Sequence, residues 1–300
     1  MNVGRDVVWV GADGALGSVL APALGARPLN LRCSDPTDDR PLSELADADT
    51  VIDAAGPRVH PGLRWADYLR EHVGTTTRVA HSMKAGSHLI LISSAAVYGS
   101  RRSHVDETTA PHPDTFPVPS YAWAKLAAEL AARAICPERG ISLTVLRPSI
   151  IYGPGAGGVF VTLRNLARRG VRVVLGPSET RHHLLHLDLF QTVLKALLGA
   201  QAPRHPATYV VADPFVVTTA DVNLALAAAG PRAAPIPVPL TIITSALKQW
   251  QIRSDRASGP LSVGAMLELD NVYEWRRCLS HLGIDPGPFG RHRFDNFIGP

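Results

Sequence analysis

Tyr121 and Lys125 stand four residues apart in the stretch Tyr-Ala-Trp-Ala-Lys, a spacing that places both side chains on one face of a helix. A lysine ammonium beside a phenol favours the phenolate, so the pair suits general acid/base work. Ser94 ends the clearest apolar run of the chain, and in a parallel sheet such strand ends form the ligand crevice. The three residues therefore predict proton transfer at the oxygen of a substrate hydroxyl or carbonyl group.

A glycine turn with the spacing GxxGxxG follows the first apolar run, residues 7–10, and opens a helical stretch. Glycines let backbone N–H groups approach a pyrophosphate, and the helix N-terminus adds positive potential. We therefore predict dinucleotide binding, with a tight structural turn as the alternative. Asp13 fits this prediction only if its carboxylate points away from the phosphates. The predicted binding residues of the turn are Gly11, Gly14, Ala15, Leu16 and Gly17.

Arg32 stands near the end of the second predicted strand, where NAD-binding folds place an acidic residue on the ribose 2′-hydroxyl. A guanidinium and the nearby Ser34 hydroxyl suit a 2′-phosphate, which slightly favours NADP over NAD as the cofactor. In the alternative interpretation Arg32 is one of many surface arginines, and Asp35 binds the ribose.

The elements that must position these residues alternate between strands and helices, which predicts a doubly wound parallel sheet of the Rossmann type in an α/β fold. The predicted strands are residues 7–10, 28–31, 50–55, 88–94, 142–147, 171–175 and 208–212. The predicted helices are residues 15–24, 65–85, 121–134, 159–169, 187–198, 240–256 and 271–282, and a proline-rich stretch at 231–239 is expected to be extended or a loop. Residues 1–152 and about 186–212 would form the dinucleotide-binding domain. Residues of about 153–185 and 213–300 would form a small C-terminal substrate-binding lobe.

Composition excludes several classes of protein. The 300 residues are 46% hydrophobic with a net charge of only +4, and no block of five like charges occurs, so neither disorder nor a nucleic-acid arm is expected. No apolar run reaches the ~18 residues of a membrane span, and the first twenty residues are expected to form a strand and turn rather than a signal peptide. The chain has three cysteines, an odd number, and they lie far apart in the sequence. This pattern does not suggest disulfides and therefore favours a reducing, cytoplasmic compartment. No cysteine or acidic cluster accompanies His182, His183 and His186, so no metal site is expected.

Taken together, these motifs resemble the extended short-chain dehydrogenases/reductases of the NAD-dependent epimerase/dehydratase type. The resemblance runs from Val7 to about Ala229. It also rests on residues 51–56, 73–75, 93–99, 147–155 and 186–188. It implies that Tyr121 is the general acid/base, that Lys125 also holds the nicotinamide ribose, and that Ser94 hydrogen-bonds the reacting oxygen. It further implies a homodimer formed through the Tyr121 helix and its neighbour. The remaining cofactor contacts that it implies are Ala54, Ala55, Gly56, Pro148 and Ser149.

The resemblance also bears on the reaction. Ala95 and Ala96 follow Ser94 where sugar-nucleotide 4,6-dehydratases carry an acidic pair, which favours ketoreductases and 4-epimerases instead. A reductase must release its cofactor after each turnover, whereas an epimerase must hold it. Because Arg32 favours NADP as the cofactor, it also favours a ketoreductase. The alternatives are a 4-epimerase with tightly held NAD and a non-enzymatic dinucleotide sensor, although a sensor has no need for all three catalytic residues.

The substrate is expected to be a small molecule, and the resemblance points to a nucleotide sugar. Arg181 stands where such members place a diphosphate-binding arginine, and the alternative is a salt-bridged surface residue. Polyketide or steroid ketones remain open as substrates. His72 stands where the family often has asparagine, either in a polar supporting role or simply as a partly buried histidine.

Overall fold

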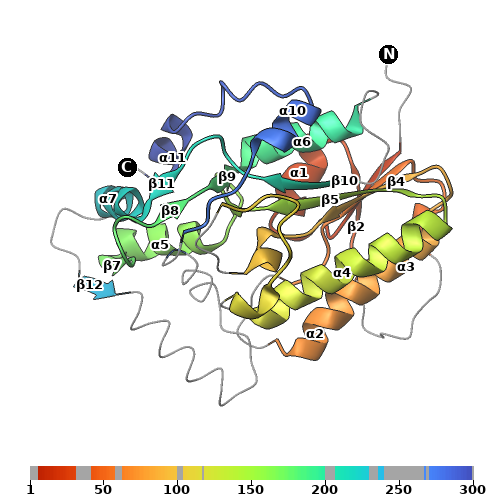
Figure 1. The fold of residues 1–300 in the computed structure, drawn as a ribbon, viewed down its shortest axis with the longest axis horizontal. Helices are drawn as coiled ribbons and strands as arrows, with labels where there is room; N and C mark the ends of the chain where they lie inside the picture. The colour runs from red at the N-terminus through yellow and green to blue at the C-terminus, as the bar shows by residue number, and fades with distance from the viewer. Residues whose placement is uncertain are drawn as a thin grey trace.

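A six-stranded parallel sheet forms the centre of the computed structural model, which describes residues 6–31, 42–57, 63–99, 104–116, 118–199, 207–229, 236–239, 267 and 270–298 (Figure 1). The strand order is β10-β5-β4-β3-β1-β2, and every neighbouring pair is parallel. The order places the carboxyl ends of β1, β3, β4 and β5 along one edge, as the sequence predicted for a doubly wound sheet. The strands are β1 (Val7–Val10), β2 (Arg27–Leu29), β3 (Thr50–Asp53), β4 (His88–Ile92), β5 (Ser142–Pro148) and β10 (Ala207–Val211).

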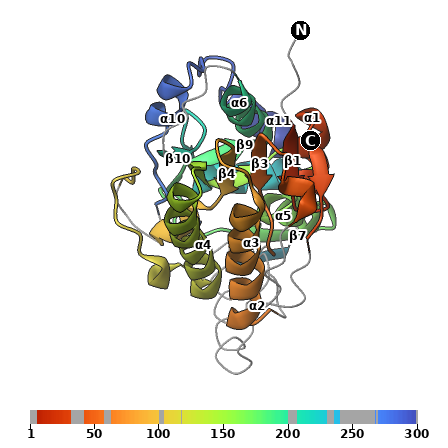
Figure 2. The ribbon, with the colours of Figure 1, turned by 90° about the vertical axis from the view of Figure 1, so that its right-hand side faces the viewer.

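Helices cover both faces of the sheet, because successive side chains of its buried strands point to opposite faces. Trp9 of β1 belongs to a core with α1, α6 and α10, whereas Val8 and Val10 belong to a second core with α3 and α4. Figure 2 shows these two helical layers on either side of the strands. The helices are α1 (Gly17–Ala23), α3 (Thr75–Ser82), α4 (Pro119–Glu138), α6 (Leu187–Leu198) and α10 (Arg276–His281).

A third buried cluster lies beside the sheet, among α5, β7, α7 and α11 (Figure 1). Small two-stranded pairings join its segments: β6 with β9, β7 with β12, and β8 with β11. Most of this cluster falls within the predicted substrate-binding lobe, whose boundaries stay a prediction, whereas β6 and His186 fall in the predicted dinucleotide-binding domain. Its elements are β6 (Ile150–Tyr152), α5 (Val159–Arg168), β7 (Val171–Val174), β8 (Arg181–His182), β9 (Leu184–His186), β11 (Val217–Thr218), α7 (Thr219–Ala229), β12 (Ile236–Pro239) and α11 (His292–Ile298).

The predicted helix at 65–85 is one helical rod with an irregular centre: α2 (Trp65–Leu69), a π-helical turn (Arg70–Gly74) and α3. The predicted helix at 271–282 is wrong over its first five residues. Asn271 donates its N–H to Arg181 and accepts from His183, so this backbone pairs with β8 and is unavailable for helical bonds. The predicted helix at 240–256 lies outside the described residues. Within the described part of the chain, no helix has the length and apolar character to cross a membrane.

Candidate active site

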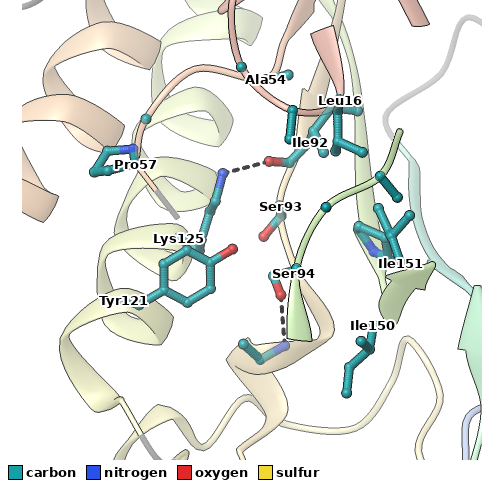
Figure 3. A pocket seen from close by; sticks show the side chains of 18 of the residues that line it. Leu16, Ala54, Pro57, Ile92, Ser93, Ser94, Tyr121, Lys125, Ile150 and Ile151 are labelled. Atoms are coloured by element: carbon teal, nitrogen blue, oxygen red, sulfur yellow. Dashed lines mark hydrogen bonds between the residues drawn. The ribbon is translucent and has the colours of Figure 1, made fainter. Parts of the chain in front are cut away.

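A cavity of about 720 Å³ opens at the carboxyl ends of β1, β3, β4 and β5. It joins the two sites that the sequence predicted separately, because the glycine turn borders one part and the serine, tyrosine and lysine border another (Figure 3). The predicted site residues that line it are Gly11, Gly14, Ala15, Leu16, Gly17, Ala54, Gly56, Ser94, Tyr121, Lys125, Pro148 and Ser149.

The glycine turn is packed so closely that side chains are excluded. A Cβ on Gly17 would lie 2.4 Å from the carbonyl oxygen of Gly11, and Gly11 itself has a φ of +83°. The Gly11 N–H donates to Leu29 at 2.8 Å, which fastens the turn to the end of β2. The Asp13 N–H donates to the Asn30 side chain at 2.9 Å. Gly11, Gly14 and Gly17 also border the cavity, and without side chains they let a bulky anionic ligand approach the backbone, as a dinucleotide requires.

Lys125 is buried on the face of α4 that carries Tyr121, one turn further along the helix. Its Nζ donates to the carbonyl oxygen of Ile92 at 2.9 Å. Burial lowers the pKa of Lys125 to about 8, although the nearby carboxylates of Asp53 and Glu129 act in the opposite direction. Burial therefore lets Lys125 lose its proton at a lower pH than an exposed lysine does.

Ser94 and Tyr121 face the same space, with the phenol oxygen directed toward the strand end that carries Ser93 and Ser94 (Figure 3). The Ser94 Oγ accepts the N–H of Ala96 at 3.1 Å, capping the short 3₁₀ turn Ala95–Tyr98. Because this bond uses an acceptor lone pair, it leaves the Ser94 hydroxyl hydrogen to donate toward the cavity.

Asp53 shapes the cavity wall after β3. It is 2% exposed and accepts hydrogen bonds from the Thr76 hydroxyl at 2.7 Å and the Ala55 N–H at 3.1 Å. Burial raises the pKa of Asp53, although these two bonds act against the shift. Ala54 and Gly56 line the cavity as predicted, whereas Ala55 packs into the core with α3 and does not border it. Ala55 acts on the cavity wall through its backbone N–H, which donates to the Asp53 carboxylate and orients it.

Arg181 lies away from the cavity. Its guanidinium donates from Nε and Nη2 to the Asp270 carboxylate, at 3.2 and 2.9 Å, with 58% of the side chain exposed. This placement favours the salt-bridged alternative over a diphosphate ligand. Arg32 lies outside the described residues.

The three histidines near β9 bond to different partners. His182 bonds to Thr219, His183 accepts from the Tyr273 N–H, and His186 accepts from the Asp188 N–H. No cluster of three or more His, Cys, Asp or Glu with metal-binding geometry occurs in the chain as described.

Several cavity residues carried no local sequence signal. They come from segments far apart in the chain, and most are apolar residues of types that fill any core. The exceptions are His72, which stands where the family often has asparagine, and Ile150 and Ile151, which belong to the segment 147–155 that carries the family resemblance. The additional lining residues include Pro57, Leu63, His72, Phe116, Ile150, Ile151, Val159, Thr162 and Tyr273.

Comparison with known proteins identifies the family of this chain. The profile of the NAD dependent epimerase/dehydratase family matches residues 7–212, more than two thirds of the chain. The chain belongs to this family. The resemblance drawn from its motifs and the predicted Rossmann-type fold are thereby confirmed.

Solved structures share the fold of this epimerase/dehydratase-family chain at low sequence identity. MoeE5 in complex with UDP-glucuronic acid and NAD is 20% identical, with a TM-score of 0.72 over 98% of this chain and 96% of that chain. UDP-glucuronic acid 4-epimerase from Bacillus cereus, with UDP-glucuronic acid and NAD, is 17% identical, with a TM-score of 0.72 over 98% of each chain. Human epimerase family protein SDR39U1 (isoform 2), with NADPH, is 18% identical, with a TM-score of 0.72 over 98% and 97%.

A curated relative, the uncharacterized protein y4nG of Sinorhizobium fredii, is 30% identical over 139 residues. The matched segment is 45% of this family member and spans only a third of the relative's length.

Proposed function

We propose that the chain is an NAD(P)-dependent oxidoreductase that acts at a carbonyl or carbinol carbon, as a ketoreductase of a nucleotide sugar or a related biosynthetic intermediate. The observation that carries the proposal is the single cavity bordered by both the glycine turn and Ser94, Tyr121 and Lys125. The nucleotide-sugar part is supported by the UDP-sugar ligands of MoeE5 and the Bacillus cereus epimerase.

The cavity fits a nicotinamide dinucleotide, because Gly11, Gly14 and Gly17 border it without side chains and so leave the backbone of the turn open to a pyrophosphate. The turn residues would hold the pyrophosphate, and Ala54, Gly56, Pro148 and Ser149 would line the rest of the cofactor path. When bound, the nicotinamide supplies or accepts the hydride.

Tyr121 would transfer the proton to or from the reacting oxygen, and Ser94 would donate a hydrogen bond to that oxygen. Lys125, in its ammonium form, favours the phenolate of Tyr121. Ala95 and Ala96 border the cavity beside Ser94 and have no titratable group, so these positions supply no acid or base for eliminating water. This arrangement supports redox chemistry over dehydration.

The first test is to denature freshly purified protein and identify the released nucleotide, with parallel titration of NADH and NADPH. We expect no bound nucleotide and a preference for NADPH, as a reductase that exchanges its cofactor requires. Stoichiometric, tightly held NAD would instead support the 4-epimerase and contradict the NADP preference inferred from Arg32. Binding of neither nucleotide would overturn the proposed function.

A second substrate class is supported by the cavity wall beyond Tyr121, where Leu63, Phe116, Ile150 and Val159 are apolar. Among the described residues that line the cavity, Lys125 is the one lysine or arginine, and a diphosphate is best bound by such cations. An uncharged ketone is the substrate this wall favours. Oxidation of UDP-glucose or UDP-glucuronic acid with NAD or NADP, set against reduction of phenanthrenequinone with NADPH, distinguishes the two classes. Cofactor binding without turnover of any carbonyl compound would favour the sensor.

The exposed face of α4 supports a proposed homodimer. Trp123 and Leu130, two turns apart on this helix, are 38% and 58% exposed, and burying such side chains stabilises association. Light scattering of the wild type and of Leu130→Glu tests this, with a monomeric wild type as the contradicting outcome. A cytoplasmic location stays a prediction from the cysteine pattern.

A further inference from the structure

His72 lies inside the π-helical turn Arg70–Gly74, where the rod of α2 and α3 departs from regular α-helical bonding. Single π-turns within α-helices redirect side chains and occur frequently at functional sites. His72 is 2% exposed and yet borders the cavity, so its imidazole forms part of the cavity wall.

One edge of this imidazole fastens the chain that follows β3. The His72 Nε2 lies 3.1 Å from the carbonyl oxygen of Pro57, and because a carbonyl oxygen only accepts, this contact is a hydrogen bond in the tautomer that carries the proton on Nε2. His72 also bonds to the backbone of Ala55, on the same stretch. The same ring packs against Gly56, whose φ is +101° and on which a Cβ would lie 2.1 Å from the His72 Nδ1. Gly56 and Pro57 both line the cavity, on the stretch that continues from Ala54 (Figure 3).

The faces and edges of the His72 ring contact tyrosines. The ring is stacked parallel to Tyr68, with centroids 6.2 Å apart, and meets Tyr121 edge-on at 5.8 Å and 75°. Burial, together with the charge of Lys125, holds the pKa of His72 well below its usual value. The imidazole is therefore neutral, and it contacts Tyr121 as a hydrogen-bonded ring without adding a second positive charge.

We propose that His72 is a positioning residue that couples the cofactor-facing wall at Gly56 and Pro57 to the orientation of the Tyr121 ring. Its Nε2–H holds the wall, and its ring limits the tilt of the phenol, so one side chain sets the distance between the cofactor path and the proton-transferring oxygen. This inference rests on the proposed function, since it assumes that the cavity holds a dinucleotide.

Two substitutions separate the two contacts. His72→Phe keeps a ring against Tyr121 and removes the hydrogen bond to Pro57. His72→Gln keeps an amide donor at the reach of Nε2 and removes the ring. His81→Gln is the matched control, because His81 is an exposed histidine on α3. Thermal unfolding of every variant checks that the fold persists.

The readouts are the Kd values of NADH and NADPH, from nicotinamide fluorescence, and turnover of phenanthrenequinone or UDP-glucose at saturating cofactor. We expect His72→Phe to weaken cofactor binding about tenfold, as the loss of one buried hydrogen bond predicts, while retaining turnover. His72→Gln should bind cofactor within about threefold of the wild type, since its donor is retained, and lose turnover. The control should match the wild type in both readouts.

A positioning role predicts that the two variants lose different properties, cofactor affinity in His72→Phe and turnover in His72→Gln. A residue that only supported the fold would lose both together. Wild-type cofactor affinity in His72→Phe, or parallel losses of affinity, turnover and melting temperature in both variants, would overturn the inference. A wild-type protein that binds neither NADH nor NADPH would instead overturn the proposed function. If neither probe is turned over, the cofactor affinities alone decide, because the Pro57 contact requires the two variants to differ.

Discussion

Glu129 and Arg147 form a buried, bidentate ion pair next to Ser93, a residue of the cavity wall. The Arg147 Nε and Nη2 donate to the two carboxylate oxygens of Glu129 at 3.0 and 2.6 Å, and both side chains are almost fully buried. Glu129 also accepts a hydrogen bond from Ser93, next to Ser94. Tyr121, Lys125 and Glu129 follow one another at four-residue spacing along α4, so one helix face presents the acid/base pair and anchors the ends of β4 and β5.

Removing the charge of Glu129 should be costly, because Arg147 would remain charged and buried. We expect Glu129→Gln to lower the free energy of unfolding by about 3–5 kcal/mol, measured by urea denaturation. The matched control is Arg133→Met, whose side chain is 39% exposed and lies 3.9 Å from Glu129. It should cost less than about 1 kcal/mol. Equal losses in the two variants would contradict a special role for the buried pair.

Tyr121→Phe should abolish most turnover without affecting cofactor binding, because it removes only the proton-transferring oxygen. A loss of about 10²–10⁴ in kcat is expected for a general acid/base. The control Tyr273→Phe removes a phenol from another part of the cavity wall and should retain turnover. Full activity in Tyr121→Phe would remove this residue from the mechanism.

The lowered pKa of Lys125 predicts how cofactor binding depends on pH. As the pH rises through about 8, Lys125 loses its proton and its attraction for an anionic dinucleotide. The Kd for NADPH should therefore rise between pH 7 and 9 in the wild type. Lys125→Met, which has no charge to lose, should bind more weakly at pH 7 and show a flatter profile. Parallel profiles in the two proteins would argue against Lys125 as the titrating group.

Because of Asp213, the free energy of unfolding should fall as the pH rises from about 4 to about 7. Burial raises its pKa to about 7, although the N–H of His186, donated at 2.9 Å, acts against the shift. An unfolded aspartate ionises near pH 4, so between about pH 4 and 7 the folded state binds the extra proton and becomes less stable as the pH rises. The full effect is about 4 kcal/mol. In urea denaturation, Asp213→Asn should lack this decline relative to the wild type, and identical pH profiles would contradict it.

Substitutions in the glycine turn should have graded effects. A Cβ on Gly17 would lie 2.4 Å from one backbone atom and 2.6 Å from another, and neither can yield, whereas on Gly14 the nearest atom is 3.1 Å away. We expect Gly17→Ala to lower stability by about 1–3 kcal/mol and to abolish cofactor binding, measured by thermal unfolding and NADPH titration. Gly14→Ala should be milder in both. The reverse order would contradict the close packing of Gly17 against the turn, and unchanged NADPH binding in both variants would argue against the turn as the cofactor site.

Local patterns were sufficient for the parallel sheet and for the catalytic triplet as a hypothesis. The strands β1, β3, β4 and β5 are buried on both faces. β1 and β4 are therefore short apolar runs that can be recognised without their neighbours, whereas β3 and β5 also contain polar residues such as Asp53 and Thr144. The spacing of Tyr121 and Lys125 needs only helical geometry, and the glycine turn needs only backbone sterics. These features depend on residues within a few positions of each other.

Tertiary structure decided the rest, because the partners are far apart in the chain. Arg181 pairs with Asp270, 89 residues away, and the strand-like pairing of Asn271 overrides the helical pattern that follows it. His72 reaches the cavity through a π-turn and contacts Pro57 and Tyr121 from a different segment. The chain by itself determined which elements form and which residues are capable of chemistry. Packing decided which of them meet, since contacts between distant segments leave no periodic signal in the sequence.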